Sequence, residues 1–244
     1  MVSPDALIKQ LVAANRILAA ERVVDAFGHV SVRHPKKANR FLLSRSKSPE
    51  LVGSDDIMEF TLDGESVDGS GRKPYLERFI HGALYEARPD ICSVVHNHSR
   101  SVIPFGITGE KLKPVMHSCA TIGPEVPVWD SRDKFGDTDL LISDMSMGRD
   151  FARILGDGTC ALMRGHGCAV AGRSIPEAVY TAIYLDVNAD LQLRASRFSN
   201  LIFLSAGEIE KINSRLVQAK PGEGFDRAWR YWCRRAGIAP TRCR

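Results

Sequence analysis

A run of apolar, β-branched residues that ends in two histidines constrains the fold of this chain more than any other feature. In Ile91-Cys-Ser-Val-Val-His-Asn-His98, the residues before the histidines are typical of a buried strand. Side chains two apart on a strand point the same way, so His96 and His98 form a pair of imidazoles. His166 lies separately, in the turn Arg164-Gly-His-Gly167 between two short strand-like segments. A His-X-His pair alone is also an ordinary polar strand face, but together with His166 it favours a divalent metal held by three imidazoles.

A carboxylate suited to such a metal lies upstream of the histidine strand. Apolar residues recur at helical spacing from Tyr75 to Arg88, just before Pro89, and predict a helix. Glu77 falls in the first turn of this helix, on the flank of its buried stripe, where partial burial suits an acid or base beside a metal. A glutamate at this position is also a common surface residue that complements the helix dipole.

Helices and strands alternate along the chain, and no linker rich in proline, glycine or serine divides it. Helices are expected near residues 5–22, 75–88, 144–155, 174–198, 207–219 and 224–236, and the fourth opens with the capping box Ser174-Ile-Pro-Glu177. Strands are expected near residues 28–34, 41–45, 57–62, 91–98, 126–129, 159–163 and 168–171. The pattern predicts an α/β fold with one domain over residues 1–244, built as a three-layer sandwich whose mixed, largely antiparallel central sheet is flanked by helices.

Composition limits the partners and the compartment. The net charge is only +4, and no recognised nucleic-acid motif accompanies the C-terminal arginines Arg227, Arg230, Arg234, Arg235, Arg242 and Arg244. A solvated helix face or a subunit contact explains that cluster better than nucleic acid does. No apolar run approaches the ~20 residues that span a bilayer, and no signal peptide is evident. The six cysteines lack C-x-x-C spacing, so we expect a protein of the reducing cytoplasm that binds neither nucleic acid nor membrane.

Over about residues 5 to 205 the chain resembles the class II aldolase and adducin family. The resemblance rests on Gly28-His-Val-Ser-Val-Arg33, Glu77 with His81 one turn on, Arg88-Pro89-Asp90, Val94-Val-His-Asn-His98 and Arg164-Gly-His-Gly167. It implies that His96, His98 and His166 bind one divalent ion per subunit, either zinc, manganese, iron or cobalt, with no organic cofactor. It also implies that Glu77 is the catalytic acid or base.

The chain departs from the sugar-phosphate aldolases of that family where they bind phosphate. Their asparagine after the first glycine, their Thr-Gly pair and their two serines before the glutamate are here His29, Ser44-Arg45 and Tyr75-Leu76. Replacing small donors in this way removes the phosphate pocket. A tyrosine that assists carbon–carbon cleavage in the aldolases is replaced by His117.

Segments 41–50, 75–82 and 128–137 are more similar to the family's decarboxylases of hydroxylated aromatic or pyridine dicarboxylates. This likeness implies a metal-dependent lyase that decarboxylates a small anionic substrate such as a dihydroxyphthalate, because retro-aldol cleavage and decarboxylation both leave a carbanion that a Lewis acid stabilises. Arg45 is then expected to pair with a second carboxylate, beside Gly28, His29 and Ser44, and His117 to hydrogen-bond or transfer a proton. A solvated strand end is the alternative for Arg45. An aldolase acting on a non-phosphorylated or sugar-derived substrate, and a non-catalytic adducin-like interaction module, are the alternative functions.

The C-terminal helices, about residues 207–236, are expected to contribute to a subunit interface. Phe225, Trp229 and Trp232 share one helical face, and interfaces are enriched in such residues, although the rings also suit packing on their own domain. Family members form symmetric tetramers in which C-terminal residues reach a neighbour's metal site. We therefore expect a homo-oligomer, a tetramer or a multiple of it, with Tyr231 completing the substrate pocket.

Overall fold

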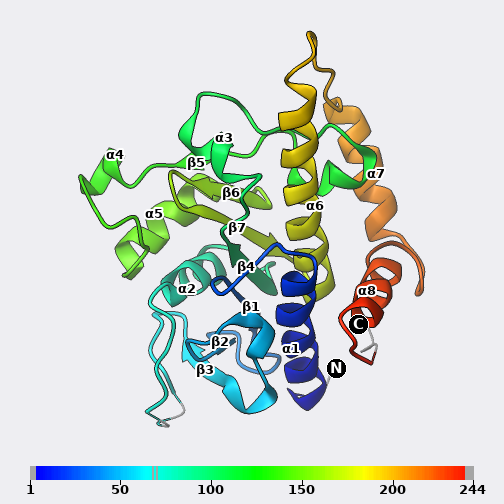
Figure 1. Cartoon of the computed structure of the whole chain (residues 1–244). Coiled ribbons are helices and arrows are strands. Elements are labelled where there is room, and N and C mark those ends of the chain that lie inside the picture. Colours follow the sequence, from blue (N-terminus) through cyan, green and yellow to red (C-terminus); the bar gives the residue numbers. More distant parts are fainter. Residues whose placement is uncertain (1–3, 68, 70, 240–244) are drawn as a thin grey trace.

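The structure is a computed structural model that describes residues 4–67, 69 and 71–239, so Arg242 and Arg244 lie outside the described residues. One sheet of seven strands runs through the molecule (Figure 1). The strands are β1 (His29–Arg33), β2 (Arg40–Ser44), β3 (Ile57–Thr61), β4 (Ser93–Asn97), β5 (Val128–Trp129), β6 (Cys160–Met163) and β7 (Gly167–Gly172). The main helices are α1 (Pro4–Ala20), α2 (Arg78–Ala87), α5 (Met145–Leu155), α6 (Ile175–Ala195), α7 (Ala206–Val217) and α8 (Gly224–Arg235).

The strand order is β3-β2-β1-β4-β7-β6-β5, and each adjacent pair is antiparallel except β5 and β6, which are parallel. The predicted mixed, largely antiparallel sheet is therefore confirmed. The sheet places β4 between β1 and β7. In these pairings His96 lies opposite His29 on one side and opposite Ala169 on the other. Segments far apart in the sequence thus meet at the end of β4.

Helices cover both faces of the sheet and enclose two apolar cores. On one face α1 and α6 pack over a core that includes Leu11, Val95 and Leu185, and on the other α2 and α5 pack over a core that includes Ile80 and Val94 (Figure 1). Neighbouring residues of β4 therefore serve opposite cores, as strand alternation requires. His96 follows in the same alternation and faces α2, the helix that carries Glu77 at its start.

The elements expected from the sequence are all present, with small shifts at their ends. The α2 helix begins at Arg78, so Glu77 is its N-cap residue and does not lie in the first turn. Ser174 caps α6 by accepting from the Glu177 amide, but the Glu177 carboxylate accepts from the amide of Arg173, so the expected capping box is only half formed. Five short helices were not predicted: η1 (Pro49–Leu51), η2 (Ser54–Asp56), α3 (Ile103–Ile107), η3 (His117–Ile122) and α4 (Arg132–Phe135).

The aromatic face of α8 packs within its own chain. Trp229 is fully buried, and the ring centroids of Phe225 and Trp232 lie 5.0 and 6.0 Å from that of Tyr180 on α6. The alternative considered for these rings, packing on their own domain, is therefore the arrangement that the structure shows. A subunit contact by α8 stays a prediction for its exposed residues, among them Tyr231.

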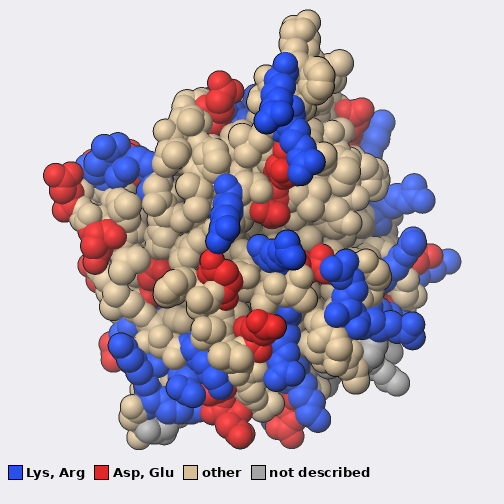
Figure 2. Space-filling model, viewed as in Figure 1, with Lys and Arg blue, Asp and Glu red and all other residues tan. Residues whose placement is uncertain are grey.

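The described helices and the charges on one face of the molecule bear on the expected partners. No described helix combines the length and the apolar character that crossing a bilayer requires. Figure 2 shows acidic residues interspersed with basic residues over this face.

Candidate metal centre

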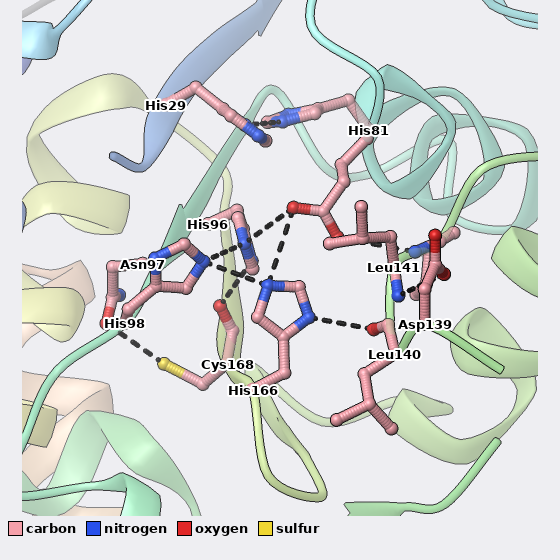
Figure 3. A network of polar contacts seen from close by, with 12 residues as sticks. His29, His81, His96, Asn97, His98, Asp139, Leu140, Leu141, His166 and Cys168 are labelled. Atoms are coloured by element: carbon pink, nitrogen blue, oxygen red, sulfur yellow. Dashed lines mark hydrogen bonds and ion pairs between the residues drawn. The ribbon is translucent and has the colours of Figure 1, made fainter. Parts of the chain in front are cut away.

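Three imidazoles converge where β4 ends and the β6–β7 turn begins (Figure 3). His96 belongs to β4, His98 follows it, and His166 occupies the turn between β6 and β7. The Nε2 atom of His98 lies 2.9 Å from that of His96 and 2.9 Å from that of His166. Together with a carboxylate oxygen of Glu77, the possible ligand atoms all lie within 4.8 Å of one another. The structure thus brings together the three histidines predicted to bind the metal and Glu77, the predicted acid or base.

Backbone carbonyls fix the orientation of two of these rings. Nδ1 of His96 donates to the carbonyl oxygen of Cys168 and Nδ1 of His166 to that of Leu140, each at 3.0 Å. With the proton on Nδ1, the Nε2 lone pair of each ring is bare and faces the other imidazoles. This is the arrangement found for metal-binding histidines, whose outer nitrogen is held by a carbonyl or carboxylate.

The cluster fits a divalent ion. Bare Nε2 lone pairs crowded together repel one another unless a cation or proton lies between them. Tetrahedral ligands about 2.1 Å from a metal are about 3.4 Å apart, so nitrogens 2.9 Å apart must separate by only about half an ångström. Burial first, and the neighbouring His96 and His166 second, lower the pKa of His98 to about 4, which keeps it in the neutral form that binds metals.

The glycines around His166 allow the close approach of β7 to β4. Gly165 has a φ of 68°, in the left-handed region that glycine adopts without strain. At Gly167 a Cβ atom would lie 2.2 Å from the carbonyl oxygen of Asn97, so any side chain would push β7 away from β4. The Gly-His-Gly sequence therefore follows from the geometry that carries His166 to the other two histidines.

Glu77 reaches the cluster from the start of α2. Its Oε2 lies 3.3 Å from Nε2 of His96 and 3.5 Å from Nε2 of His166, and its Oε1 accepts from the amide of Ile142. The residue is only 8% exposed, which excludes the surface alternative considered from the sequence. Burial acts to raise the pKa of Glu77, but the adjoining imidazoles of His96 and His166 and the hydrogen bond from the Ile142 amide together lower this pKa to about 2. The carboxylate is therefore ionised.

A second set of buried polar side chains adjoins the cluster behind His29. Nδ1 of His29 lies 2.6 Å from Nε2 of His81, whose Nδ1 lies 2.6 Å from the hydroxyl oxygen of Ser31. That hydroxyl lies 2.7 Å from the phenol oxygen of Tyr85. Burial, aided by the neighbouring His96, lowers the pKa of His81 to about 3, and burial also lowers that of His29.

Sequence reasoning gave no role to the residues behind His29. The one signal for His81 was its position four residues after Glu77, which places it on the same face of the helix. Gly28 precedes this set with a φ of 100°, and a Cβ there would meet Val24 at 2.7 Å and the carbonyl oxygen of His96 at 3.1 Å. Gly28 thus fits the backbone closely against β4, while His29 brings a side chain to the cluster.

The guanidinium of Arg45 forms an ion pair, so Arg45 is more than a solvated strand end. Its Nε donates to Oδ1 of Asp56 at 2.6 Å, and Nζ of Lys47 donates to Oδ2 at 2.7 Å. Partial burial acts to raise the pKa of Asp56, but hydrogen bonds from Lys47, the Gly53 amide and Arg45 lower it to about 2. One carboxylate therefore holds two cations together. Lys47 and Asp56 were missed because their pairing depends on η2 folding back against β2.

Tyr75 connects this cation pair to the histidines. Its phenol donates to the carbonyl oxygen of Lys47, and its ring centroid lies 4.5 Å from that of His29. The His29 ring in turn lies 4.9 Å from the His96 ring. Ser44 is fully buried, and its hydroxyl lowers the pKa of Tyr75 against the raising effect of burial. Tyr75 thus lies between His29 and the backbone of Lys47, whose side chain shares Asp56 with Arg45.

Two sequence-predicted residues lie apart from the site within one chain. His117 is exposed at the start of η3, and Tyr231 is 56% exposed on α8, where its ring centroid lies 5.8 Å from the guanidinium of Arg235. In the part of the chain that the structure describes, no hydrogen bond, ion pair or ring contact joins either residue to the histidine cluster. Their roles stay predictions that require a neighbouring subunit.

A hollow of about 680 Å³ gives access beside His98. It lies between the loop after α1, η1 and the start of the segment that follows β4, and it includes Arg22, Asp25, Arg100 and Asp186 in its wall. A volume of this size lies in the range of small-molecule sites. His98 is therefore the residue of the cluster that borders this hollow.

Comparisons with known proteins agree with this geometry. The chain matches the family described as the Class II Aldolase and Adducin N-terminal domain over residues 9–193. It is 33% identical to Decarboxylase tropJ of Talaromyces stipitatus, over 93% of this chain and 92% of that protein. It is 28% identical to the 3,4-dihydroxyphthalate decarboxylase of Terrabacter sp., over 94% and 97% respectively. Among solved structures it is similar to an aldolase II superfamily protein from Pseudomonas syringae, with a TM-score of 0.78 and 25% identity over 96% of this chain and 94% of the other.

Proposed function

Because the chain belongs to the class II aldolase and adducin family, we propose that it is a divalent-metal-dependent lyase that decarboxylates a hydroxylated aromatic or pyridine dicarboxylate. Relatives that carry the name decarboxylase, one of them a 3,4-dihydroxyphthalate decarboxylase, support this branch of the family. The observation that carries the proposal is the cluster of His96, His98, His166 and Glu77, whose nitrogen lone pairs and carboxylate converge on one point.

The histidines hold the metal and Glu77 moves the proton. A divalent ion held by His96, His98 and His166 supplies a Lewis acid for negative charge on substrate oxygens. The ionised Glu77 carboxylate takes the proton of the substrate's ring hydroxyl. The electron pair of the C–C bond stays on the ring carbon as carbon dioxide leaves, Glu77 returns its proton to that carbon, and the ring oxygen regains a proton from solvent, so one C–C bond breaks and one C–H bond forms. Its contact with the Ile142 amide keeps one oxygen fixed while the other faces the reacting atoms.

The Arg45–Lys47 pair binds the substrate's second carboxylate. Asp56 neutralises one of the two cations and holds both in place, which leaves one net positive charge for an anion. The contacts from His96 through His29 to Tyr75 and Lys47 lead from the cluster to this pair. Gly28, His29 and Ser44 line the same side, and His29 offers its free ring nitrogen to the substrate.

Neighbouring subunits complete the site in a cytoplasmic homo-oligomer, a tetramer or a multiple of it. His117 and Tyr231 lie on the surface of the single chain. Both are then donated to the pocket of an adjacent subunit, together with exposed residues of α7 and α8. The single domain over residues 1–244 forms the repeating unit.

Metal analysis coupled to an assay of carbon dioxide release tests the proposal. The purified protein is expected to contain about one divalent ion per chain and to release carbon dioxide from members of a panel of hydroxylated aromatic and pyridine dicarboxylates. A His96→Ala, His98→Ala double variant should lose the ion and the activity, since metal sites depend on ligand number. Aldehyde release from a sugar-derived substrate would replace the proposal with an aldolase. A wild-type protein without metal or activity would instead point to an adducin-like interaction module.

A further inference from the structure

The side chains behind His29 form one continuous chain of hydrogen bonds. It runs from the phenol of Tyr85 through the hydroxyl of Ser31 and both nitrogens of His81 to Nδ1 of His29, with heavy-atom distances of 2.7, 2.6 and 2.6 Å. Ser31, His81 and Tyr85 are at most 1% exposed. Figure 3 shows its last link, with the His29 and His81 rings facing each other beside the cluster.

Each hydrogen bond in this series contains one proton. The direction of the bond between Tyr85 and Ser31 therefore sets the direction of the bonds from Ser31 to His81 and from His81 to His29. The Tyr85 hydroxyl has two acceptors within reach, the Ser31 oxygen at 2.7 Å and the carbonyl oxygen of Cys92 at 3.5 Å. Ordinary O–H···O hydrogen bonds are 2.5–3.0 Å long, so the Tyr85 proton points to Ser31. The Ser31 hydroxyl then donates to Nδ1 of His81, and Nε2 of His81 donates to Nδ1 of His29. The remaining proton of a neutral His29 must be on Nε2.

Packing holds the donor end of the chain in place. The guanidinium of Arg33 lies over the Tyr85 ring, 4.8 Å from its centroid, and donates to the Tyr85 carbonyl oxygen. The Phe41 ring lies 5.6 Å from the Tyr85 ring and stacks on the His81 ring. Burial raises the pKa of the Tyr85 phenol, which therefore keeps its proton.

We propose that Tyr85, Ser31 and His81 act as positioning residues that lock His29 in the tautomer with a proton on Nε2, so that His29 donates a hydrogen bond to an anionic oxygen of the substrate. Among the described residues Nε2 of His29 has no hydrogen-bond partner, whereas the His96 and Tyr75 rings flank His29. The opposite tautomer would present a bare lone pair and repel a carboxylate or phenolate. The lock thus decides whether this position attracts or repels the substrate.

The role of His29 toward the substrate rests on the proposed function, but the tautomer of His29 can be tested without it. Neutron diffraction from a deuterium-exchanged crystal of the zinc-loaded protein, without substrate, locates the ring protons directly. We expect deuterium on Nε2 of His29 and on Nε2 of His81, with none on Nδ1 of either ring. Deuterium on Nδ1 of His29 would overturn the lock. Because no turnover is involved, this result stands even if every tested dicarboxylate proves not to be a substrate.

Kinetics of two serine variants separate the lock from a merely structural role. Ser31→Ala removes the donor to His81, and we expect kcat/KM to fall ~10- to 100-fold, mostly through KM, because hydrogen bonds to charged groups contribute on this scale. Ser93→Ala is the matched control. Ser93 is also buried, but its hydroxyl donates to the carbonyl oxygen of Ser31 and takes no part in the hydrogen bonds from Tyr85 to His29. Both variants should keep the wild-type metal content. Equal kcat/KM values for the two variants would contradict the proposal.

Variants of His81 test the last link. In His81→Gln the side-chain amide can still donate to Nδ1 of His29, so we expect most of the wild-type kcat/KM to be retained. His81→Leu offers no donor and should lose as much as Ser31→Ala. Retention of activity in the leucine variant, or equal loss in both, would show that hydrogen bonding by His81 does not orient His29.

Discussion

Replacing Glu77 by glutamine tests the proton transfer with almost no change of shape. The amide oxygen can accept from the Ile142 amide as Oε1 does, and the amide nitrogen takes the place of Oε2 beside the three imidazoles. The buried side chain therefore keeps its contacts. What disappears is a carboxylate able to accept and return a proton.

The expected loss follows from that single change. A positioned acid or base contributes ~10²- to 10⁴-fold to the rate, so turnover should fall by at least ~100-fold, or about 2.7 kcal/mol in the barrier. His96, His98 and His166 are unchanged, so the metal content should stay close to that of the wild type. Initial rates of carbon dioxide release at saturating substrate, with metal content measured on the same sample, give both quantities.

A second glutamine variant on α2 provides the control. Glu86 is exposed and pairs with Arg149 at 2.7 Å, on the side of the helix away from the histidines. Glu86→Gln removes the same charge from the same helix and should turn over at about the wild-type rate. Near-normal turnover in fully metal-loaded Glu77→Gln would refute the reasoning and transfer the role to another group, with His117 next to be tested.

Three further predictions concern stability and assembly. Trp229→Ala should destabilise the fold by about 3–5 kcal/mol, measured by thermal unfolding, since the ring is fully buried; an unchanged midpoint would mean that α8 is not part of the core. The lowered pKa of Asp56 contributes stability that is present above about pH 4 and is lost as the pH falls towards 2, so Asp56→Asn should flatten the acid limb of the unfolding profile, and an identical limb in both proteins would contradict the pairing with Arg45 and Lys47. Tyr231→Ala should lower activity while sedimentation still detects an oligomer, whereas an active wild-type monomer would refute a shared site.

The cluster of three histidines and Glu77 could be predicted from the sequence because its signals are local. His96 and His98 are two residues apart on a strand with unmistakable apolar character, and His166 is marked by its two glycines. Glu77 was a candidate from its position at the start of a helical stripe, and the family resemblance gave it the role of acid or base. None of these inferences depends on knowing which strand pairs with which.

The hydrogen bonds from Tyr85 to His29 and the Arg45–Lys47 pair could not be predicted from the sequence, because they depend on contacts between distant segments. His81 gains its partners only when β1 lies beside β4 and α2 covers both. Asp56 pairs with Arg45 only when η2 folds back on β2. The aromatic stripe of α8 was ambiguous for a related reason: amphipathic spacing states that a face is buried but not whether Trp229 packs on its own chain or on a partner.

The cluster lies between β4 and β7, so its side chains come together only when these two strands have paired. His98 and His166 are separated by 68 positions along the chain, yet their nitrogens meet at 2.9 Å. Chain closure over such a distance is entropically costly, so the unfolded polypeptide rarely gathers these ligands. If the proposed divalent ion binds there, its uptake during refolding would report when β4 and β7 pair at the centre of the sheet. An ion bound there would hold β4 and β7 together and would slow their separation.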